Sequence, residues 1–303
     1  MSKGKRVISI FLSVILCAVS FFGVYTTSAS AATSGSCGAS GSSVNWSYDT
    51  NTKQLTISGS GDIKNYSVIT IFDRVPWYDY RNECTSLVIG EGVTGIGDRA
   101  FYQMSALQSA SLPSTLTVIS DYAFAECTNL SEINLPPNLT TIRAYAFNKS
   151  GITQVVFPDS LTSIGRTRIG NVETGFTFAD CPNLESVKFG SGLTDTGLAT
   201  FRNSGVKHVD FGNTVTTIGE WSFYGTFITS VALPETIASV GMRAFSEIPT
   251  LYEVYIYNDA CSFNGVIGDD PFAGSQQSLT FYGHSQSTTQ TYAEEHGYHF
   301  VSI

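Results

Sequence analysis

The chain repeats one pattern of about 22 residues, and this repeat constrains its fold more than any other feature of the sequence. A phenylalanine marks each copy, at Phe101, Phe124, Phe147, Phe178, Phe201, Phe223, Phe245 and Phe272. The intervals between these marker phenylalanines are 23, 23, 31, 23, 22, 22 and 27 residues, so five intervals are regular and two contain insertions. A fixed period of this length indicates stacked structural units that share one continuous core.

Each period contains two apolar segments. The first is an L-x-x-V-x-I pattern, as in residues 130–135, whose alternation predicts a short strand with one packed face. Proline cannot continue a ladder, and a proline ends four of these strands, at Pro113, Pro136, Pro158 and Pro234. The second pattern, L-T-x-I-x-x-x-A-F, as in residues 139–147, predicts an extended arm and one helical turn that buries the phenylalanine. Helical segments this short are unstable alone, so each unit must pack against the next.

The two patterns together predict an α/β solenoid. We expect a rod of about eight coils of 22–23 residues, with parallel strands on one face and short turns or helical turns on the other. At the spacing of stacked strands the rod is about 40 Å long. Open ends would expose core and strand edges, so a cap is expected at each end. We assign residues 33–83 to an N-terminal β cap, 84–283 to the repeats and 284–303 to a C-terminal cap.

Residues 1–32 have the features of a secretory signal peptide. Lys3, Lys5 and Arg6 precede an apolar run over 7–24, and small residues follow up to Ala32. A membrane anchor is the alternative, because the run is nearly long enough to span a bilayer. The small-residue cluster directly after the run favours cleavage. We therefore predict a secreted or extracellular chain, released or held non-covalently at the cell surface, with no membrane span after cleavage.

The net charge argues against several partners. The formal charge is −9, and removal of three signal-peptide cations changes it to −12. Nucleic acid and anionic lipid require clustered Lys and Arg, so neither is an expected partner. Metal-binding spacings such as CxxC and HxxxH are missing from the sequence, as are a phosphate-binding glycine loop and a nucleophile elbow. We expect no metal and no cofactor.

The repeated sequence motifs resemble those of a known family. SLTSIG at 160–165 and AFAECTNLSEINLP at 123–136 are similar to the BspA-like (treponemal-type) leucine-rich repeat of surface and secreted proteins in bacteria and some protists. The resemblance covers roughly residues 84–283, and the flanking segments resemble the caps of these proteins. It implies adhesion to, or recognition of, host or extracellular macromolecules. The insertion at 165–177 and Thr196, which replaces an inward isoleucine, depart from the pattern.

The outward positions of the strands are the candidate binding surface. Positions three and five of each strand pattern face solvent in a parallel ladder, and their side chains are small, polar and weakly charged. Such a row suits recognition of a large protein or glycoprotein; the alternative is a solvated face that keeps the rod soluble. The selected candidates are Glu132, Asn134, Gln154, Lys188, His208, Asp210, Glu253 and Tyr255. Arg166 and Arg168 in the insertion are a loop candidate, or part of a surface excursion without a ligand.

Two other functions compete with binding. Ser186, His208, Asp210 and Ser230 lie on adjacent rungs and carry the residue types of a hydrolase. A flat strand face supplies neither an ordered hydrogen-bond chain nor an oxyanion hole, so we assign no catalytic residue and expect no enzyme. The second competitor is a structural protein of the cell surface that assembles without a foreign ligand, through Cys127, Cys181 or Cys261.

The cysteines also carry structural predictions. A disulfide between Cys37 and Cys84 is predicted to join the first cap to the first repeat strand. Cys127 and Cys181 share one repeat position two coils apart, about 10 Å at the spacing of strands. This distance exceeds the disulfide limit of about 7 Å between Cα atoms. We expect both to be small buried apolar residues.

Overall fold

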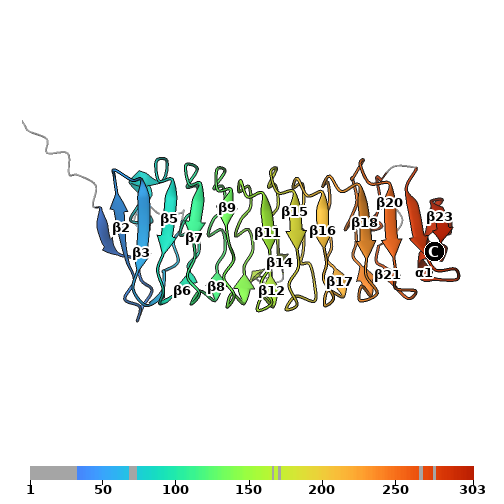
Figure 1. Ribbon diagram of the computed structural model, residues 1–303, viewed down its shortest axis with the longest axis horizontal. Coiled ribbons are helices and arrows are strands. Elements are labelled where there is room, and N and C mark those ends of the chain that lie inside the picture. The colour runs from blue at the N-terminus through green and yellow to red at the C-terminus, as the bar shows by residue number, and fades with distance from the viewer. Residues whose placement is uncertain (1–32, 68–73, 166, 170–171, 266–268, 276–277) are drawn as a thin grey trace, which may run out of the picture. The chain divides into compact units, whose positions relative to one another are not determined.

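The computed structural model describes residues 33–67, 74–165, 167–169, 172–265, 269–275 and 278–303, all within the compact unit Ala32–Ile303. The predicted signal peptide lies outside the described residues. Within this unit the chain winds into a parallel β-solenoid of about nine turns. Figure 1 shows the successive coils side by side, in sequence order from the blue to the red end. The predicted solenoid with parallel strands on one face is confirmed.

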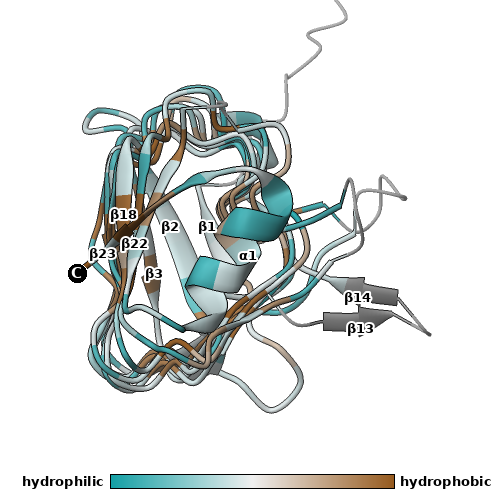
Figure 2. Ribbon diagram, turned by 90° about the vertical axis from the view of Figure 1, so that its right-hand side faces the viewer, coloured by the Kyte–Doolittle hydropathy of each residue, from teal (hydrophilic) through white to brown (hydrophobic). Residues whose placement is uncertain are grey.

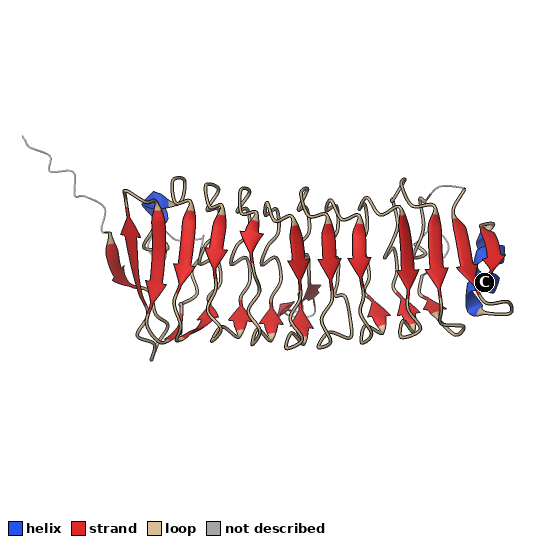
Figure 3. Ribbon diagram, viewed as in Figure 1, coloured by secondary structure: helices blue, strands red, loops and turns tan. Residues whose placement is uncertain are grey.

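One row of strands runs along the solenoid, and we call it the strand face (Figure 3). In sequence order these are β1 (Ser34–Ser36), β2 (Asn45–Asp49), β3 (Gln54–Ser58), β5 (Ser86–Ile89), β7 (Ser109–Ser111), β9 (Glu132–Ile133), β11 (Gln154–Val156), β15 (Ser186–Lys188), β16 (His208–Asp210), β18 (Ser230–Leu233), β20 (Glu253–Ile256), β22 (Thr280–Gly283) and β23 (His299–Ser302). They pair in the orders β1-β2-β3-β5-β7-β9, β11-β15-β16 and β18-β20-β22-β23. Pairing is antiparallel only from β1 to β3 and parallel in the remaining described pairs of this row.

A second row of shorter strands lies on another side of each coil. It consists of β4 (Gly61–Asp62), β6 (Val93–Ile96), β8 (Val118–Ile119), β10 (Thr141–Ile142), β12 (Ser163–Ile164), β17 (Thr217–Ile218), β19 (Ser239–Val240) and β21 (Ser262–Phe263). These strands also pair in parallel, for example Ile142 with Ile119 and Ile164. They are the extended arms of the second sequence pattern, and their isoleucines are buried.

The segments that carry the marker phenylalanines are turns, so of the predicted short turns or helical turns the structure has the former. Tyr145 and Lys149, two residues before and after Phe147, have φ values of 58° and 57°. A right-handed helix of L-residues cannot continue through positive φ, so each segment is closed at both ends. The helices of the described residues are the 3-10 helix η2 (Tyr78–Tyr80) and α1 (Thr288–His296). The α part of the predicted α/β class is therefore minor.

The marker phenylalanines form the core of the solenoid. All eight are at most 1% exposed, and the ring centroids of successive members are 5.0 to 5.8 Å apart from Phe101 to Phe272. Trp77 extends the stack by one ring, 5.5 Å from Phe101. These distances lie within the range of favourable aromatic pairs. Each coil thus completes the burial of its neighbour, which a single coil cannot achieve.

The N-terminal end is closed by the β2–β3 hairpin. Its inward side chains are buried, namely Val44, Trp46, Leu55 and Ile57. The Trp46 ring meets the Trp77 ring edge-on at 6.1 Å and so joins the hairpin to the core.

The predicted disulfide between Cys37 and Cys84 is not present, since both are buried free thiols in the structure. Cys84 takes the first apolar position of the strand pattern, where the next coil has Leu107. Its Sγ donates a hydrogen bond to the Ser86 carbonyl oxygen at 3.4 Å, and burial raises its pKa to about 11. The thiol acts as a small core side chain.

The C-terminal end is closed by α1 and β23. Ser287 caps α1 by accepting a hydrogen bond from the Gln290 backbone N–H at 3.3 Å, and Gly297 ends the helix with a φ of 73°. In the end view of Figure 2, α1 lies across the opening of the last coil. β23 then adds in parallel to β22 and becomes the last strand of the strand face.

The two departures from the repeat have separate structural outcomes. Thr196 is fully buried, where its Oγ1 lies 2.8 Å from the Ser222 Oγ and accepts from the Gly219 N–H at 2.8 Å. A polar link inside the core thus replaces the missing isoleucine. The insertion contains an antiparallel pair, β13 (Thr167–Ile169) and β14 (Val172–Thr174). Arg168 lies on β13, whereas Arg166 falls outside the described residues.

Candidate functional site

The strand face presents the predicted outward side chains to solvent. Six candidates are exposed and two, Glu253 and Tyr255, are half-buried; the exposed ones are Glu132, Asn134, Gln154, Lys188, His208 and Asp210. The alternation of each strand causes this, as in β11, where Val155 is buried between exposed Gln154 and Val156. The structure therefore places all eight on one face, spread over several coils.

Register brings four of the candidates together near the middle of the strand face. On β11, β15 and β16, Gln154 pairs through Ser186 with His208, and Val156 pairs through Lys188 with Asp210. The Lys188 Nζ lies 3.3 Å from Asp210 Oδ2, and both side chains are more than half exposed. An exposed ion pair of this kind contributes little stability, so both groups can exchange partners at low cost.

The hydrolase arrangement does not form. Asp210 accepts a hydrogen bond from the Gly212 backbone N–H at 3.0 Å and is paired with Lys188. Within the described part of the chain, His208 makes no side-chain hydrogen bond to Asp210 or to a serine. No Ser-His-Asp chain therefore exists on this face, and the strands supply no oxyanion hole.

A shallow cavity of about 240 Å³ lies near the N-terminal end of the strand face. It exists because short side chains on β5 and β7 stand beside longer ones on the next coil. Its outward lining includes Ser86, Ser109, Ser111, Glu132 and Asn134. Hydroxyl, amide and carboxylate groups around a depression of this size suit one projecting polar side chain of a larger ligand.

Sequence reasoning missed one outward aromatic residue, Tyr282 on β22. It pairs in register with Tyr255, and the two rings stack at a centroid distance of 4.3 Å with an interplanar angle of 9°. The sequence signal is the alternation in Thr280–Gly283, where buried Phe281 puts Tyr282 on the outer side. The C-terminal end of the strand face is consequently aromatic, in contrast to its polar middle.

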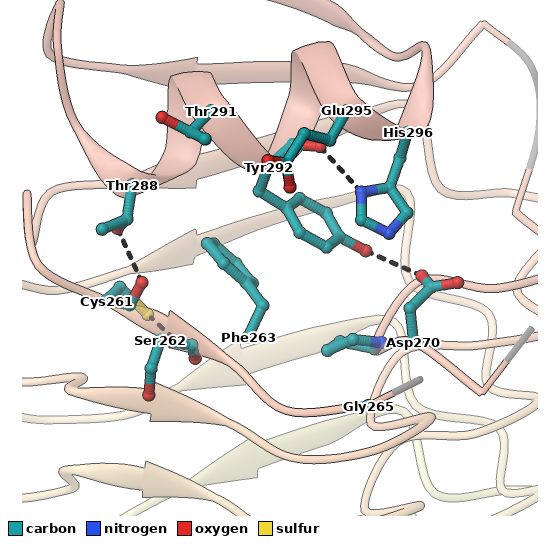
Figure 4. A pocket seen from close by; sticks show the side chains of 11 residues that line it. Cys261, Ser262, Phe263, Gly265, Asp270, Thr288, Thr291, Tyr292, Glu295 and His296 are labelled. Carbon is teal, nitrogen blue, oxygen red and sulfur yellow. Dashed lines mark hydrogen bonds between the residues drawn. The ribbon is translucent and has the colours of Figure 1, made fainter. Parts of the chain in front are cut away.

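A cavity of about 820 Å³ lies between α1 and the last coil and was not predicted (Figure 4). The Tyr292 hydroxyl donates to Asp270 Oδ1 at 2.7 Å, and the Phe272 N–H donates to the same oxygen at 3.1 Å. Burial, reinforced by the Asp270 carboxylate, raises the pKa of Tyr292 above its ordinary value. His296 Nδ1 donates to the Tyr292 carbonyl oxygen at 2.9 Å. The bond between Tyr292 and Asp270 attaches α1 to the last coil, and the bond from His296 lies within α1 itself.

A different row of side chains follows the turns, on the residues two before the marker phenylalanines, and we call it the turn row. Its rings stack from coil to coil: Tyr122 lies 4.7 Å from Tyr145, and Tyr145 lies 5.1 Å from Phe176. Guanidinium groups contact the row further along: Arg243, a member of the row, lies 5.0 Å from the Trp221 ring, and Arg202, one residue after Phe201, lies 5.2 Å from the same ring. The rings of the turn row thus contact one another and neighbouring guanidinium groups of the same chain.

The five cysteines of the described region are buried and free. Cys127 Sγ donates to the Phe101 carbonyl oxygen and Cys181 Sγ to the Phe147 carbonyl oxygen, each at 3.1 Å in the preceding coil. Burial raises the pKa of both thiols to about 12. Such thiols are unreactive, because the thiolate is the reactive form.

Across the described ranges, no three or more His, Cys, Asp or Glu side chains gather in a way that could hold a metal ion. No helix in those same ranges has the length and apolar character needed to cross a bilayer.

Comparison with known proteins identifies the repeat. The family model for the BspA type leucine-rich repeat region, which contains six copies, matches residues 66–175 and 169–293. A search of curated proteins found no match.

Solved structures with the same kind of repeat were also found. A leucine-rich repeat protein from Bacteroides ovatus is 18% identical, with a TM-score of 0.44, over 86% of this chain and 80% of that chain. The T. pallidum leucine-rich repeat protein is 21% identical, with a TM-score of 0.44, over 84% and 94%. A leucine-rich cell surface protein from Faecalibacterium prausnitzii is 18% identical, with a TM-score of 0.35, over 83% and 95%. With its family model matched over most of its length and the repeat visible coil by coil, the chain belongs to the BspA-type leucine-rich repeat family.

Proposed function

We propose that this chain is a secreted or cell-surface protein that binds an extracellular protein or glycoprotein through its strand face. The observation that carries the proposal is the contrast in partners between the two outer rows. The turn row pairs its side chains with one another, whereas exposed strand-face groups such as Gln154 and His208 make no side-chain hydrogen bond to any described residue. A long row of such groups on a rigid scaffold is suited to many weak contacts with a large ligand.

The scaffold supports this proposal through its stiffness. Outward side chains stand on strands whose inner residues are buried against a continuous aromatic stack. A pre-formed surface loses little conformational entropy on binding, which favours recognition without a deep pocket. The family is also consistent with an extracellular location, since one solved relative is described as a cell surface protein.

The proposal is tested by binding the purified chain to arrays of extracellular-matrix proteins, mucins and glycans. We expect at least one ligand whose affinity falls when strand-face residues are replaced, with Glu132→Ala and His208→Ala as the test variants. Glu220→Ala is the matched control, because Glu220 is exposed but lies beside the turn row. A ligand whose affinity changes with Glu220→Ala and not with the strand-face variants would place binding elsewhere and refute the proposal.

Assembly through cysteines is the competing function, and the structure offers it little support. Cys127, Cys181 and Cys261 are fully buried, and burial raises the pKa of each thiol to about 12. We expect a thiol-specific maleimide to leave the folded chain unlabelled at pH 7 and to label it after unfolding. Rapid labelling of the folded chain, or disulfide-linked oligomers on a non-reducing gel, would favour assembly.

We also propose that the protein is not an enzyme. The Asp210 carboxylate is engaged by Lys188 and by the Gly212 N–H rather than by His208. Turnover of an ester, peptide or glycan substrate that disappears in His208→Ala would contradict this.

A further inference from the structure

The C-terminal end of the strand face combines aromatic rings with one carboxylate. Glu253 and Tyr255 alternate outward on β20, and Tyr282 stands beside Tyr255 on β22. Tyr252 and Tyr257, immediately before and after β20, are 49% and 40% exposed. We call Glu253, Tyr255 and Tyr282 the tyrosine platform.

The two ring hydroxyls of the platform share the carboxylate. Tyr255 donates to Glu253 Oε2 at 3.4 Å and Tyr282 donates to Glu253 Oε1 at 3.5 Å. Both distances exceed the 2.5 to 3.0 Å of a strong O–H···O bond, so most of the accepting capacity of the carboxylate is unused. No Lys or Arg of the described residues forms an ion pair with Glu253.

One face of the Tyr255 ring is open. Tyr282 covers the other face at 4.3 Å, but the register partner of Tyr255 on β18 is Ala232, whose side chain is a single methyl group. Ala232 and its neighbour Ser230 are exposed, so the space above them is accessible. Tyr255 thus combines an accessible ring face over short neighbours with the Glu253 carboxylate beside its hydroxyl.

The C-terminal part of the chain, to which the platform belongs, is strongly negative. Residues 226–303 contain eight acidic residues and one Lys or Arg, Arg243, which gives a formal charge of −7 out of −9 for the whole chain. Arg243 is bound to Asp269 at 2.6 Å on the turn side and is not available to Glu253. A cation approaching the platform therefore meets an attractive field and no fixed competitor.

Aromatic faces and carboxylates together select for a planar cation. An arginine guanidinium stacks on a tyrosine ring while it donates hydrogen bonds to a carboxylate beside the ring. The geometry points to the tyrosine platform as a docking site for an arginine side chain of a basic segment in an extracellular protein partner. This inference rests on the proposed function and names the chemical class of the partner.

The test uses a fluorescein-labelled decapeptide of alternating arginine and glycine, titrated with the purified chain and followed by fluorescence anisotropy. The matched probe replaces every arginine with citrulline, which is planar and uncharged. We expect binding of the arginine peptide, weakened by added salt as exposed charges are screened, and no binding of the citrulline peptide.

Single substitutions test which residues of the tyrosine platform contact the arginine peptide. An exposed cation–π or ion-pair contact contributes about 0.5–1 kcal/mol, so Glu253→Gln and Tyr255→Ala should each raise the Kd about two- to fivefold. Tyr255→Phe keeps the ring and should remain within about twofold of the parent, since the stacking surface is unchanged. Glu294→Gln on α1 is the matched control, because it removes one exposed charge from the same end of the protein without touching the platform.

Each alternative outcome overturns the inference. An equal loss of peptide affinity in Glu294→Gln and Glu253→Gln would show that the acidic residues attract the basic peptide in general, without a specific site. Equal binding of the citrulline peptide, or displacement of the arginine peptide by a neutral oligosaccharide such as maltohexaose, would show that the rings bind uncharged groups. An array ligand that depends on Glu132 and His208, combined with absence of peptide binding, would remove this inference and leave the proposed function intact.

Discussion

The turn row and the strand face are two outer surfaces of the same coils, and they are built on opposite principles. In the turn row, Tyr145 lies between Tyr122 and Phe176 with interplanar angles of 3° and 7°. On the strand face, the exposed residues of β11 and β16 point to solvent. The turn row stacks its rings from coil to coil, whereas the strand face has some paired groups, such as Lys188 with Asp210, and exposed groups such as Gln154 and His208 without a side-chain hydrogen bond to a described residue. Repetition alone therefore does not separate the two outer surfaces; the contacts of the repeated groups do.

The phenylalanine core is the reference for this comparison, and its disruption should lower the free energy of unfolding most. Phe147 packs between Phe124 and Phe178 at 5.3 and 5.0 Å and is fully buried. We expect Phe147→Ala to lower the free energy of unfolding by about 3–5 kcal/mol, because a large cavity would break the continuous stack. Urea denaturation followed by circular dichroism measures this. A loss below about 1 kcal/mol would show that coils are stable without their neighbours.

The polar link at Thr196 should give the next largest effect. Thr196→Val removes the hydroxyl that lies 2.8 Å from Ser222 Oγ and accepts from the Gly219 N–H, both inside the solenoid. A buried group left without its partner costs about 1–3 kcal/mol, and we expect this loss in urea denaturation. Thr216→Val makes the same chemical change at an exposed site and should stay within about 0.5 kcal/mol. Similar losses in both variants would refute the link.

Disruption of the turn row should cause the next largest loss of stability. Tyr145→Ala removes two ring pairs, and each is worth about 0.5–1.5 kcal/mol, so we expect a loss of about 1–3 kcal/mol. Tyr145 has a φ of 58°, a conformation that glycine adopts without strain. Tyr145→Gly should therefore be more stable than Tyr145→Ala by about 1 kcal/mol. Thermal melts with equal midpoints for the two variants would rule out strain at this position.

A substitution on the strand face should change the free energy of unfolding least. Val156 is 57% exposed on β11, and Val156→Ala should change the free energy of unfolding by less than about 0.5 kcal/mol. The comparison with Tyr145→Ala is direct, because both residues lie on the outside of the solenoid. A loss above about 1 kcal/mol in Val156→Ala would show that the strand face also stabilises the fold, and the distinction between the rows would fail.

Sequence reasoning predicted the strand face better than it predicted the turns. The alternation in residues 130–135 and its equivalents identifies inward and outward positions, because successive side chains on a strand point to opposite faces. The turns were predicted only as short turns or helical turns, because tyrosine and lysine rarely adopt positive φ and nothing local marks Tyr145 or Lys149 as exceptions. Packing between coils imposes that conformation, and one coil read alone does not contain it.

The sequence predicted only part of the candidate site, because contacts between coils are not contained in one coil either. The parity of β20 identified Tyr255 as outward, but its stacking partner Tyr282 lies one coil later and depends on register. The disulfide between Cys37 and Cys84 was wrong because counting cysteines gives no direction for a thiol, whereas packing turns Cys84 into the core. The cavity beside Tyr292 depends on where α1 meets the last coil, which no repeat unit encodes.

The amino-acid sequence by itself determined that this protein is a solenoid with a phenylalanine core and an outward row of strand residues. Period and alternation are properties of a chain in one dimension, and they follow from the need of each short unit to bury one side. Only the tertiary structure decided which outer row stacks its side chains from coil to coil and which has exposed groups without a side-chain hydrogen bond. That outcome depends on distances of about 5 Å between residues more than twenty positions apart, such as Tyr122 and Tyr145, and stacking alone sets them.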